Sequence, residues 1–163
     1  MMEKFKEALS FAASICSTSE QCAADVLRKT DKFGLSIEEK DMLVQKLKQD
    51  GFLDEKRYVR AYVNDRFKFS KWGKMKITYM LKQKGIDARI VENALEMIDQ
   101  DDYTGTLLDL LKQKRKSIIS SGITDLKAKL YRFALSRGFE PTVTVKCLKK
   151  MKLCEDEGNS AEY

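Results

Sequence analysis

The chemistry-bearing side chains of this sequence are densest in one stretch, "RFKFSKWGKMKITYMLKQK", which runs from Arg66 to Lys84. It holds seven Lys or Arg residues and no Asp or Glu. Lysines bind phosphate groups as point charges without reading base sequence. A solvated helix usually interleaves the two signs four residues apart. The imbalance therefore favours contact with a polyanion or an acidic protein face, and the alternative is the solvated back of a helix that packs on a core.

Aromatic residues lie among these basic ones: Phe67, Phe69, Trp72 and Tyr79. Such rings can stack on the bases of a single-stranded nucleic acid. They can equally fill the junction between two helices, and we expect this packing role. No helix-turn-helix with a polar base-reading face is apparent, so sequence-specific DNA recognition is not expected.

Enzyme chemistry finds little support in the sequence. The chain has no histidine, the usual general base and metal ligand. Phosphate-binding loops and nucleophile elbows are also missing. The cysteines are Cys16, Cys22, Cys147 and Cys154, with no CxxC pair, which indicates reduced thiols of a cytosolic protein rather than a zinc site. We expect no enzymatic activity, no cofactor and no metal.

Composition indicates an all-α fold. The 163 residues include one proline and eight glycines, and helix-forming residues such as Leu, Lys, Ala and Glu dominate. The apolar run 8–16 has helix periodicity, so we interpret it as a core-facing helix rather than a signal peptide. No segment approaches the roughly 18 apolar residues of a membrane span. The net charge of +6 favours acidic partners.

Glycines and capping residues divide the chain into about nine helices. Gly34, Gly51, Gly85 and Gly138 each follow a helical pattern, where a C-cap glycine belongs. Ser36 and Glu39 form a predicted capping box, and residues 18–21 offer a second. Predicted first-turn signals are Asp54, Asp87, Asp101 and Pro141. The expected helices are 3–16, 19–31, 36–49, 54–70, 72–84, 87–99, 101–118, 123–137 and 140–152.

The helical pattern repeats along the chain. An offset of 53 residues pairs Ile77 with Leu130 and Gly85 with Gly138, and a looser offset of 51 pairs Gly34 with Gly85. We therefore expect three tandem three-helix repeats, 1–53, 54–100 and 101–153, in an elongated, curved array, followed by a frayed acidic tail, 154–163. Such arrays offer long surfaces rather than one deep pocket.

The basic charge recurs with the repeat. Lys74 corresponds to Lys127, Lys76 to Lys129 and Lys84 to Arg137. The segment "KQKRKS" adds Lys112, Lys114, Arg115 and Lys116, and the ninth helix adds Lys146, Lys149, Lys150 and Lys152. On a helical wheel of 71–84, Lys71, Lys74 and Lys82 share one flank, while Gly73 lies in the buried stripe. A glycine there predicts the close approach of a neighbouring helix.

Two motifs carry a resemblance to a known family. "GFLDEKRYVRAYVNDRF" resembles a signature of the RecX family of bacterial recombination regulators, through Gly51, Phe52, Leu53, Asp54, Glu55, Arg57, Tyr58, Tyr62 and Arg66. "WGKMKITYMLKQKGI" resembles the repeat pattern of that family, through Gly73, Ile77, Leu81, Lys84, Gly85 and Ile86, and "FALSRGF" is similar to its third-repeat version. Val59 departs from the usual alanine, and the first repeat is the most divergent.

The resemblance implies three three-helix repeats and a non-enzymatic, cytoplasmic modulator of the RecA recombinase in recombination, DNA repair and the SOS response. It implies binding in the groove of the RecA–DNA filament and, most often, inhibition of ATP hydrolysis and strand exchange. Weak, sequence-independent binding to single- and double-stranded DNA, a monomeric state and no membrane contact are also expected. The alternatives are a DNA-binding helical module that acts without RecA, and a helical adaptor for another acidic protein.

The candidate contact residues for RecA or DNA are the basic ones on the second and third repeats. For Arg57 a local ion pair near Asp54 and Glu55 is an equally good explanation. The candidate set is Arg57, Arg66, Lys71, Lys74, Lys76, Lys82, Lys127, Lys129, Arg132 and Arg137.

Overall fold

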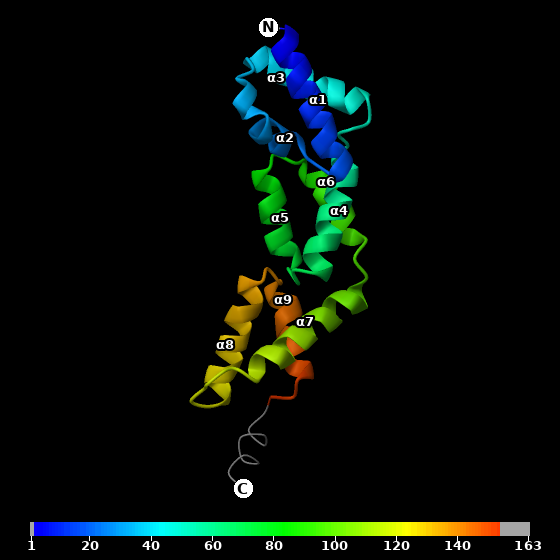
Figure 1. Cartoon of the computed structure of the whole chain (residues 1–163). Coiled ribbons are helices and arrows are strands. Elements are labelled where there is room, and N and C mark those ends of the chain that lie inside the picture. The colour runs from blue at the N-terminus through cyan, green and yellow to red at the C-terminus, as the bar shows by residue number, and fades with distance from the viewer. Residues whose placement is uncertain (1, 154–163) are drawn as a thin grey trace. The chain divides into compact units, whose positions relative to one another are not determined.

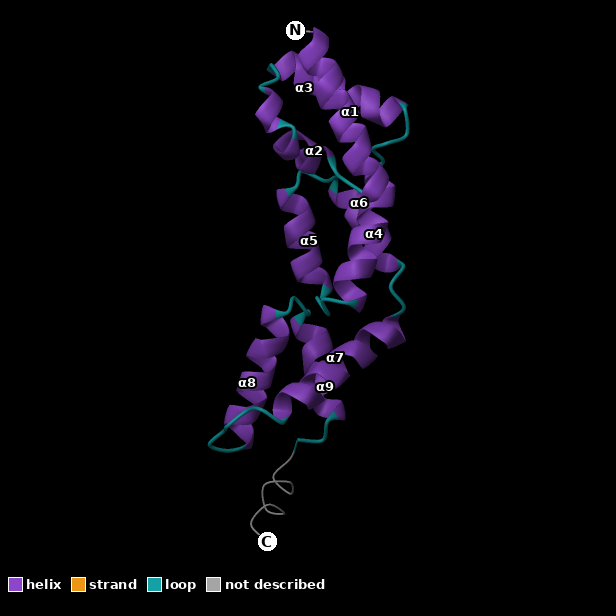
Figure 2. Ribbon diagram, in the orientation of Figure 1, coloured by secondary structure: helices purple, strands orange, loops and turns teal. Residues whose placement is uncertain are grey.

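The computed structural model describes residues 2–153, and the predicted tail 154–163 lies outside this range. The described residues are all-α, with nine α-helices, one short 3-10 helix and no strand, which confirms the predicted fold class (Figures 1 and 2). The elements are α1 (Met2–Thr18), α2 (Ala23–Lys29), η1 (Asp31–Phe33), α3 (Ile37–Gln49), α4 (Glu55–Lys68), α5 (Lys74–Gln83), α6 (Ala88–Glu96), α7 (Gln100–Arg115), α8 (Ile123–Ser136) and α9 (Pro141–Lys150).

Most predicted helix ends are confirmed by their capping contacts. Ser36 and Glu39 form the complete capping box at the start of α3. Asp54 accepts a hydrogen bond from the Arg57 amide at the start of α4, and Pro141 occupies the first turn of α9. The four predicted C-cap glycines have φ between 60° and 94°, the left-handed region in which glycine carries no steric penalty.

Three predicted helix starts were wrong. Residues 18–21 form no capping box, because α1 runs through Thr18 and α2 begins only after its N-cap, Cys22. At α7 the N-cap is Asp99, not Asp101, since its carboxylate accepts from the Asp102 amide at 3.0 Å. Helix α5 begins at Lys74 rather than 72, because Lys71 takes a left-handed backbone with φ 58°.

The described helices belong to two compact units. Unit 1 comprises Met1–Asn64 and Met80–Ala94, and unit 2 comprises Asp65–Tyr79 and Leu95–Tyr163. These units divide α4 and α5, so they do not follow the boundaries of the three expected repeats, and the repeat division stays a prediction.

The core of unit 1 lies where α1 and α2 pack against α3. Small residues on α1 allow this close packing, since Ala8 and Ala12 are fully buried beside Leu43 and Leu47 of α3 and Val26 of α2. Burying these aliphatic side chains stabilises the unit by about 1.5–3 kcal/mol for each large one.

The core of unit 2 lies between α7, α8 and α9, which pack on one another. Leu107 and Leu111 of α7 and Leu130 of α8 are fully buried. The ring of Tyr103, also fully buried, lies 5.2 Å from that of Phe139 and 5.7 Å from that of Phe67. Phe67 therefore has the packing role that we expected for it.

Among residues 2–153, no helix is long and apolar enough to cross a lipid bilayer.

Candidate functional site

Gly73 and Gly138 meet inside unit 2 and bring together two basic segments that are far apart in the sequence. The Gly73 amide donates to the Arg137 carbonyl oxygen at 2.8 Å, and the Met75 amide donates to that of Gly138 at 2.9 Å. A Cβ on Gly73 would lie 2.3 Å from the Gly138 carbonyl carbon, and one on Gly138 would lie 2.3 Å from the Cβ of Lys76. The predicted close approach at Gly73 is confirmed, and the start of α5 is thereby joined to the end of α8.

Two of the candidate cations near this junction flank the Trp72 ring. The Arg66 guanidinium carbon lies 4.9 Å from the ring centroid, and the Lys76 ammonium lies 4.5 Å from it. Cation–π contacts of this kind hold the two charges against the ring. Trp72 is half-buried, so it supports the two cations rather than standing out as a stacking platform.

Arg137 and Lys74 are engaged by the fold of unit 2. The Arg137 guanidinium donates to the Ser70 carbonyl oxygen at 2.7 Å. The Lys74 ammonium lies 4.7 Å from the centroid of the Tyr103 ring, whose hydroxyl accepts a hydrogen bond from the Lys74 amide at 2.9 Å. That hydroxyl donates to the Glu140 carboxylate, and burial followed by this hydrogen bond raises the pKa of Tyr103 well above its usual range. These two candidates therefore stabilise the unit before they contact any partner.

Three candidate residues of unit 2 are exposed and uncommitted. Within the described residues, the side chains of Lys71, Lys127 and Arg132 make no hydrogen bond or ion pair. Lys129 differs, because its ammonium donates to the Ile119 carbonyl oxygen at 2.6 Å and pairs with Asp125 at 3.1 Å. The first three side chains are therefore the strongest of the candidates for contact with a partner.

Two candidate residues lie in unit 1, and they behave differently. The Arg57 guanidinium pairs with Glu20 at 2.5 Å and donates to the carbonyl oxygens of Gly51 and Phe52. This arrangement gives Arg57 a structural role. Its ion-pair partner is Glu20 rather than Asp54 or Glu55, the carboxylates near it in the sequence. Lys82 on α5 is exposed.

The aromatic residues of this basic stretch differ in their exposure to solvent. Phe69 and Tyr79 expose 78% and 60% of their surface, whereas Phe67 exposes 8%. The expectation that these rings pack between helices is therefore wrong for Phe69 and Tyr79, because each faces solvent. In unit 2 both residues lie in the segment that carries Lys71 and the start of α5.

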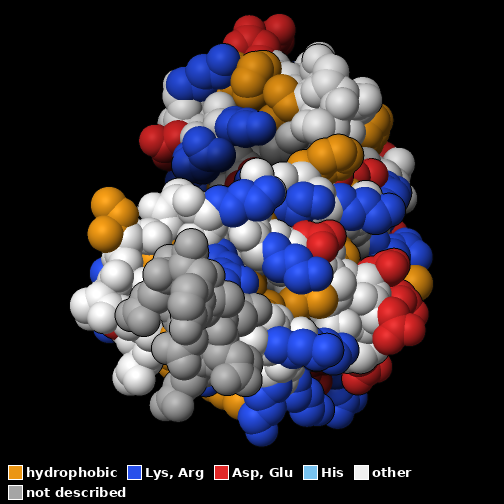
Figure 3. Space-filling view, turned by 90° about the horizontal axis from the view of Figure 1, so that it is seen from below, with side chains coloured by type: hydrophobic (Ala, Val, Ile, Leu, Met, Phe, Trp, Pro, Cys, Tyr) orange, Lys and Arg blue, Asp and Glu red, His pale blue; other side chains and the backbone are white. Residues whose placement is uncertain are grey.

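Charge is distributed very unevenly between the two units. The described part of unit 2 holds 17 Lys and Arg against eight Asp and Glu, whereas unit 1 holds 14 against 13. Figure 3 shows Lys and Arg side chains distributed over one face of the molecule, among Asp, Glu and apolar side chains. Unit 2 is therefore the part of the chain that attracts anions.

Helix α9 and the residues after it contribute basic groups that were left out of the candidate set. Lys149 and Lys152 are exposed and line a depression of about 620 Å³ together with Lys127. The basic run on α9 is visible in the sequence, but none of its lysines has a basic counterpart 53 residues earlier.

The cysteines and acidic groups build no metal centre in residues 2–153. Cys22 and Cys147 are buried free thiols, Cys16 is half-buried, and burial raises the pKa of each of the three. Cys154 lies outside the described residues.

Comparisons with known proteins agree with one another. A family model described as "RecX, second three-helix domain" matches residues 54–95. A "Regulatory protein RecX" from Clostridium botulinum (strain Eklund 17B / Type B) is 34% identical over 114 residues, covering 67% of this chain and 53% of that protein. One from Finegoldia magna is 28% identical over 146 residues, covering 85% and 68%. The chain spans about half the length of the first curated relatives it matches.

Solved structures show the same fold. A crystal structure of RecX from Lactobacillus salivarius superimposes with a TM-score of 0.80 at 20% identity, covering 94% of this chain and all of that one. A second, of a regulatory protein RecX, gives 0.82 at 18% identity, covering 90% and 73%. The family model and the curated relatives show that the chain belongs to the RecX family of regulatory proteins.

Proposed function

We propose that this chain is a non-enzymatic, cytoplasmic regulator that binds the RecA–DNA filament and lowers its ATP hydrolysis and strand exchange. The observation that carries the proposal is the excess of nine basic over acidic residues in the described part of unit 2, with Lys71, Lys127 and Arg132 exposed and uncommitted there. The curated relatives are named regulatory proteins, and the link to RecA comes from the family resemblance of the motifs at 51–67 and 72–86.

The chemistry of the surface suits a filament that combines protein and phosphate. Lysine ammonium groups bind phosphates without base selectivity, so the DNA sequence inside a filament does not matter. The cation–π contacts with Trp72 hold the Arg66 and Lys76 side chains in place before binding. Less side-chain entropy is therefore lost when a partner binds.

The alternative function is sequence-independent DNA binding without RecA. It is favoured by Phe69 and Tyr79, whose exposed rings lie in the same basic segment and could stack on unpaired bases. In that case the chain binds free single-stranded DNA tightly, and the affinity falls steeply with salt.

The deciding experiment titrates the chain into a RecA reaction and follows DNA-dependent ATP hydrolysis. Inhibition is expected at concentrations well below those that saturate free DNA. An unchanged ATPase at several-fold molar excess over RecA refutes the proposal. Inhibition that appears only once free DNA is saturated supports the alternative.

A charge-reversal variant tests whether the basic surface of unit 2 contacts the filament. Changing Lys71, Lys127 and Arg132 to Glu should weaken inhibition, since these side chains are exposed and make no hydrogen bond or ion pair within the described chain. The matched control changes Lys6, Lys48 and Arg60 to Glu, which alters the same charge on exposed residues of unit 1. Equal loss in both variants would contradict a specific role for unit 2. Melting temperatures should stay close to that of the parent chain, because exposed substitutions contribute little to stability.

A further inference from the structure

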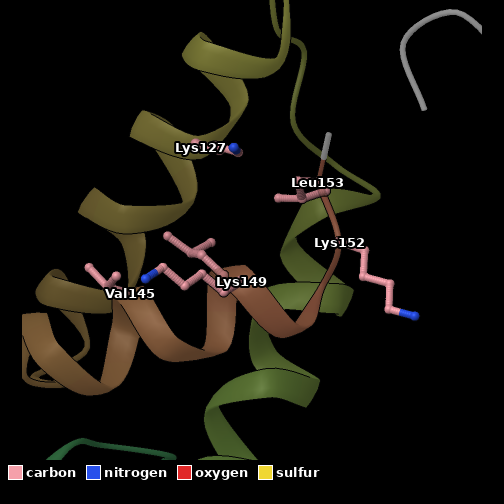
Figure 4. Close-up of a pocket in the computed structure, with 6 residues that line it drawn as sticks. Lys127, Val145, Lys149, Lys152 and Leu153 are labelled. Carbon is pink, nitrogen blue, oxygen red and sulfur yellow. The ribbon is translucent and has the colours of Figure 1, made fainter. Parts of the chain in front are cut away.

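Unit 2 has an apolar depression with a basic rim, between α8 and the end of α9. It is lined by Lys127, Val145, Leu148, Lys149, Lys152 and Leu153 and has a volume of about 620 Å³. Figure 4 shows Lys127 on α8 opposite Val145 and Lys149 on α9, with Leu153 at the far side and the Lys152 ammonium pointing outward. An apolar floor with cations around it suits a segment that carries both an apolar side chain and carboxylates.

The rim cations are available for such a segment. Lys127, Lys149 and Lys152 are all exposed, and none makes an ion pair with another residue of the described chain. The apolar lining is partly accessible, because Val145 is 41% exposed, whereas Leu153 is only 4% exposed. The depression therefore lacks a compensating negative group within the described residues.

The backbone after α9 turns toward this depression. Lys152 adopts φ 52°, a left-handed conformation that is unfavourable for a residue with a side chain. Its amide donates to the Lys149 carbonyl oxygen at 3.2 Å. This turn places Leu153 in the lining of the depression.

The segment that follows, residues 154–163, has the complementary chemistry. It carries Glu155, Asp156, Glu157 and Glu162, no Lys or Arg, and one large apolar side chain, Tyr163. Ten residues can extend about 33 Å, which is ample to fold back over a depression that begins next to Leu153. Because the link is covalent, the effective concentration of the segment at the depression is in the millimolar range or above.

We propose that residues 154–163 dock into this depression, with Tyr163 on the apolar floor and the carboxylates beside Lys127, Lys149 and Lys152. The docked segment covers part of the basic surface of unit 2 and competes with acidic partners for it. This second consequence rests on the proposed function, whereas the docking itself does not.

Methyl NMR tests the docking directly. The methyl signals of Val145, Leu148 and Leu153 are compared between the full chain and a chain that ends after Cys154. Deletion should shift these signals, and 1 M NaCl should shift those of the full chain in the same direction, since salt screens the ion pairs. The internal control is Leu110, which lines a separate depression with Phe133 and Lys114. Unchanged signals at Val145 and Leu148, or equal shifts at Leu110, overturn the proposal.

Two further variants separate docking from a general charge effect. Tyr163→Ser keeps every charge of the segment but should reproduce most of the methyl shifts of the deletion. A synthetic peptide of residues 154–163, with Cys154→Ser to prevent disulfide formation, should reverse those shifts when added to the shortened chain. The same peptide with its four acids as amides should not. Failure of the acidic peptide to act at millimolar concentration counts against docking.

The regulatory consequence is measured with fluorescent single-stranded oligothymidylate. The shortened chain and Tyr163→Ser should both bind it several-fold more tightly than the full chain at low salt. Tighter binding of the shortened chain alone, with Tyr163→Ser like the parent, would show that only long-range charge is involved and overturn the proposal. None of these measurements uses RecA, so they stand apart from a failure of the RecA titration.

Discussion

The Gly73 amide donates a 2.8 Å hydrogen bond to the carbonyl oxygen of Arg137, although the two residues are 64 positions apart in the sequence. This bond, with the absence of a Cβ on both Gly73 and Gly138, lets two backbone turns touch directly inside unit 2. The cations at the start of α5 and at the end of α8 are held by this contact. The stability of unit 2 and the arrangement of its basic surface are therefore connected.

Gly73→Ala should destabilise the chain. The new methyl group would lie 2.3 Å from the Gly138 carbonyl carbon, so backbone has to move, at a cost of about 1–3 kcal/mol or more. Urea unfolding followed by circular dichroism measures the change.

The matched control is Gly105→Ala inside α7, where a Cβ meets nothing within 4 Å. That variant should be more stable than the parent by about 0.5–1 kcal/mol, because alanine loses less backbone entropy in a helix. Equal effects of the two substitutions would contradict the close approach at Gly73.

Tyr103→Phe should destabilise unit 2 without enlarging its core. The hydroxyl joins the Lys74 amide to the Glu140 carboxylate, and its removal leaves both without this buried partner, at a cost of about 1–3 kcal/mol. Thermal unfolding measures the loss. A second change, Glu140→Gln, should cost much less in a chain that already carries Tyr103→Phe than in the parent, and additive effects of the two changes would argue against the shared hydrogen-bond network.

Lys84→Ala and Lys82→Ala should differ sharply, although the residues are two positions apart. The Lys84 ammonium donates to the Asp25 carboxylate at 2.8 Å, and both side chains are mostly buried. Its loss should cost about 1–3 kcal/mol of unfolding free energy. Lys82 is exposed, and its substitution should leave stability within about 0.5 kcal/mol of the parent. Similar melting temperatures for the two variants would contradict the structural role of Lys84.

The Asp25–Lys84 ion pair should also affect how the free energy of unfolding decreases at acidic pH. Burial opposes ionisation of Asp25, but the hydrogen bonds from Lys84 and Cys22 outweigh it, and the pKa of Asp25 is lowered from its usual value of 3.8. A lowered pKa contributes stability that is present above about pH 4 and is lost as the pH falls through the folded-state value.

The measurement for this decrease is urea unfolding between pH 6 and pH 2 for the parent chain and for Asp25→Asn. The variant should be less stable at pH 6, and its stability should fall less steeply below pH 4. Parallel curves would show that Asp25 contributes nothing to the decrease at acidic pH. Asp54 gives a comparison, because its lowered pKa comes first from the Arg57 amide hydrogen bond at a helix start.

Much of the secondary structure could be predicted from short-range signals. The capping box at Ser36 and Glu39, the left-handed glycines and the proline at the start of α9 involve groups within about four residues of one another. At α7 the prediction failed, because Asp99 rather than Asp101 is the N-cap. The two aspartates are two residues apart, so residue type alone did not distinguish them.

The candidate site was only partly predictable for the same reason. Spacing identified a basic surface and the family motifs, and it placed Lys82 but not Lys84 among the candidate contacts, but it could not tell Arg57 from Arg132. The partner of Lys84 is 59 residues away, and that of Arg57 is 37 residues away. The basic wall of the depression also joins α8 to the end of α9, so it exists only after those helices pack.

The all-helical class, most helix ends, the family and the excess of positive charge could be predicted from the amino-acid sequence, because these depend on composition and on neighbours along the chain. Which cations stay available and which are bound within the fold became apparent from the tertiary structure. It also showed that Gly73 meets Gly138, and that the three rim lysines share one depression. These properties depend on distances between residues far apart in sequence, which are set by packing.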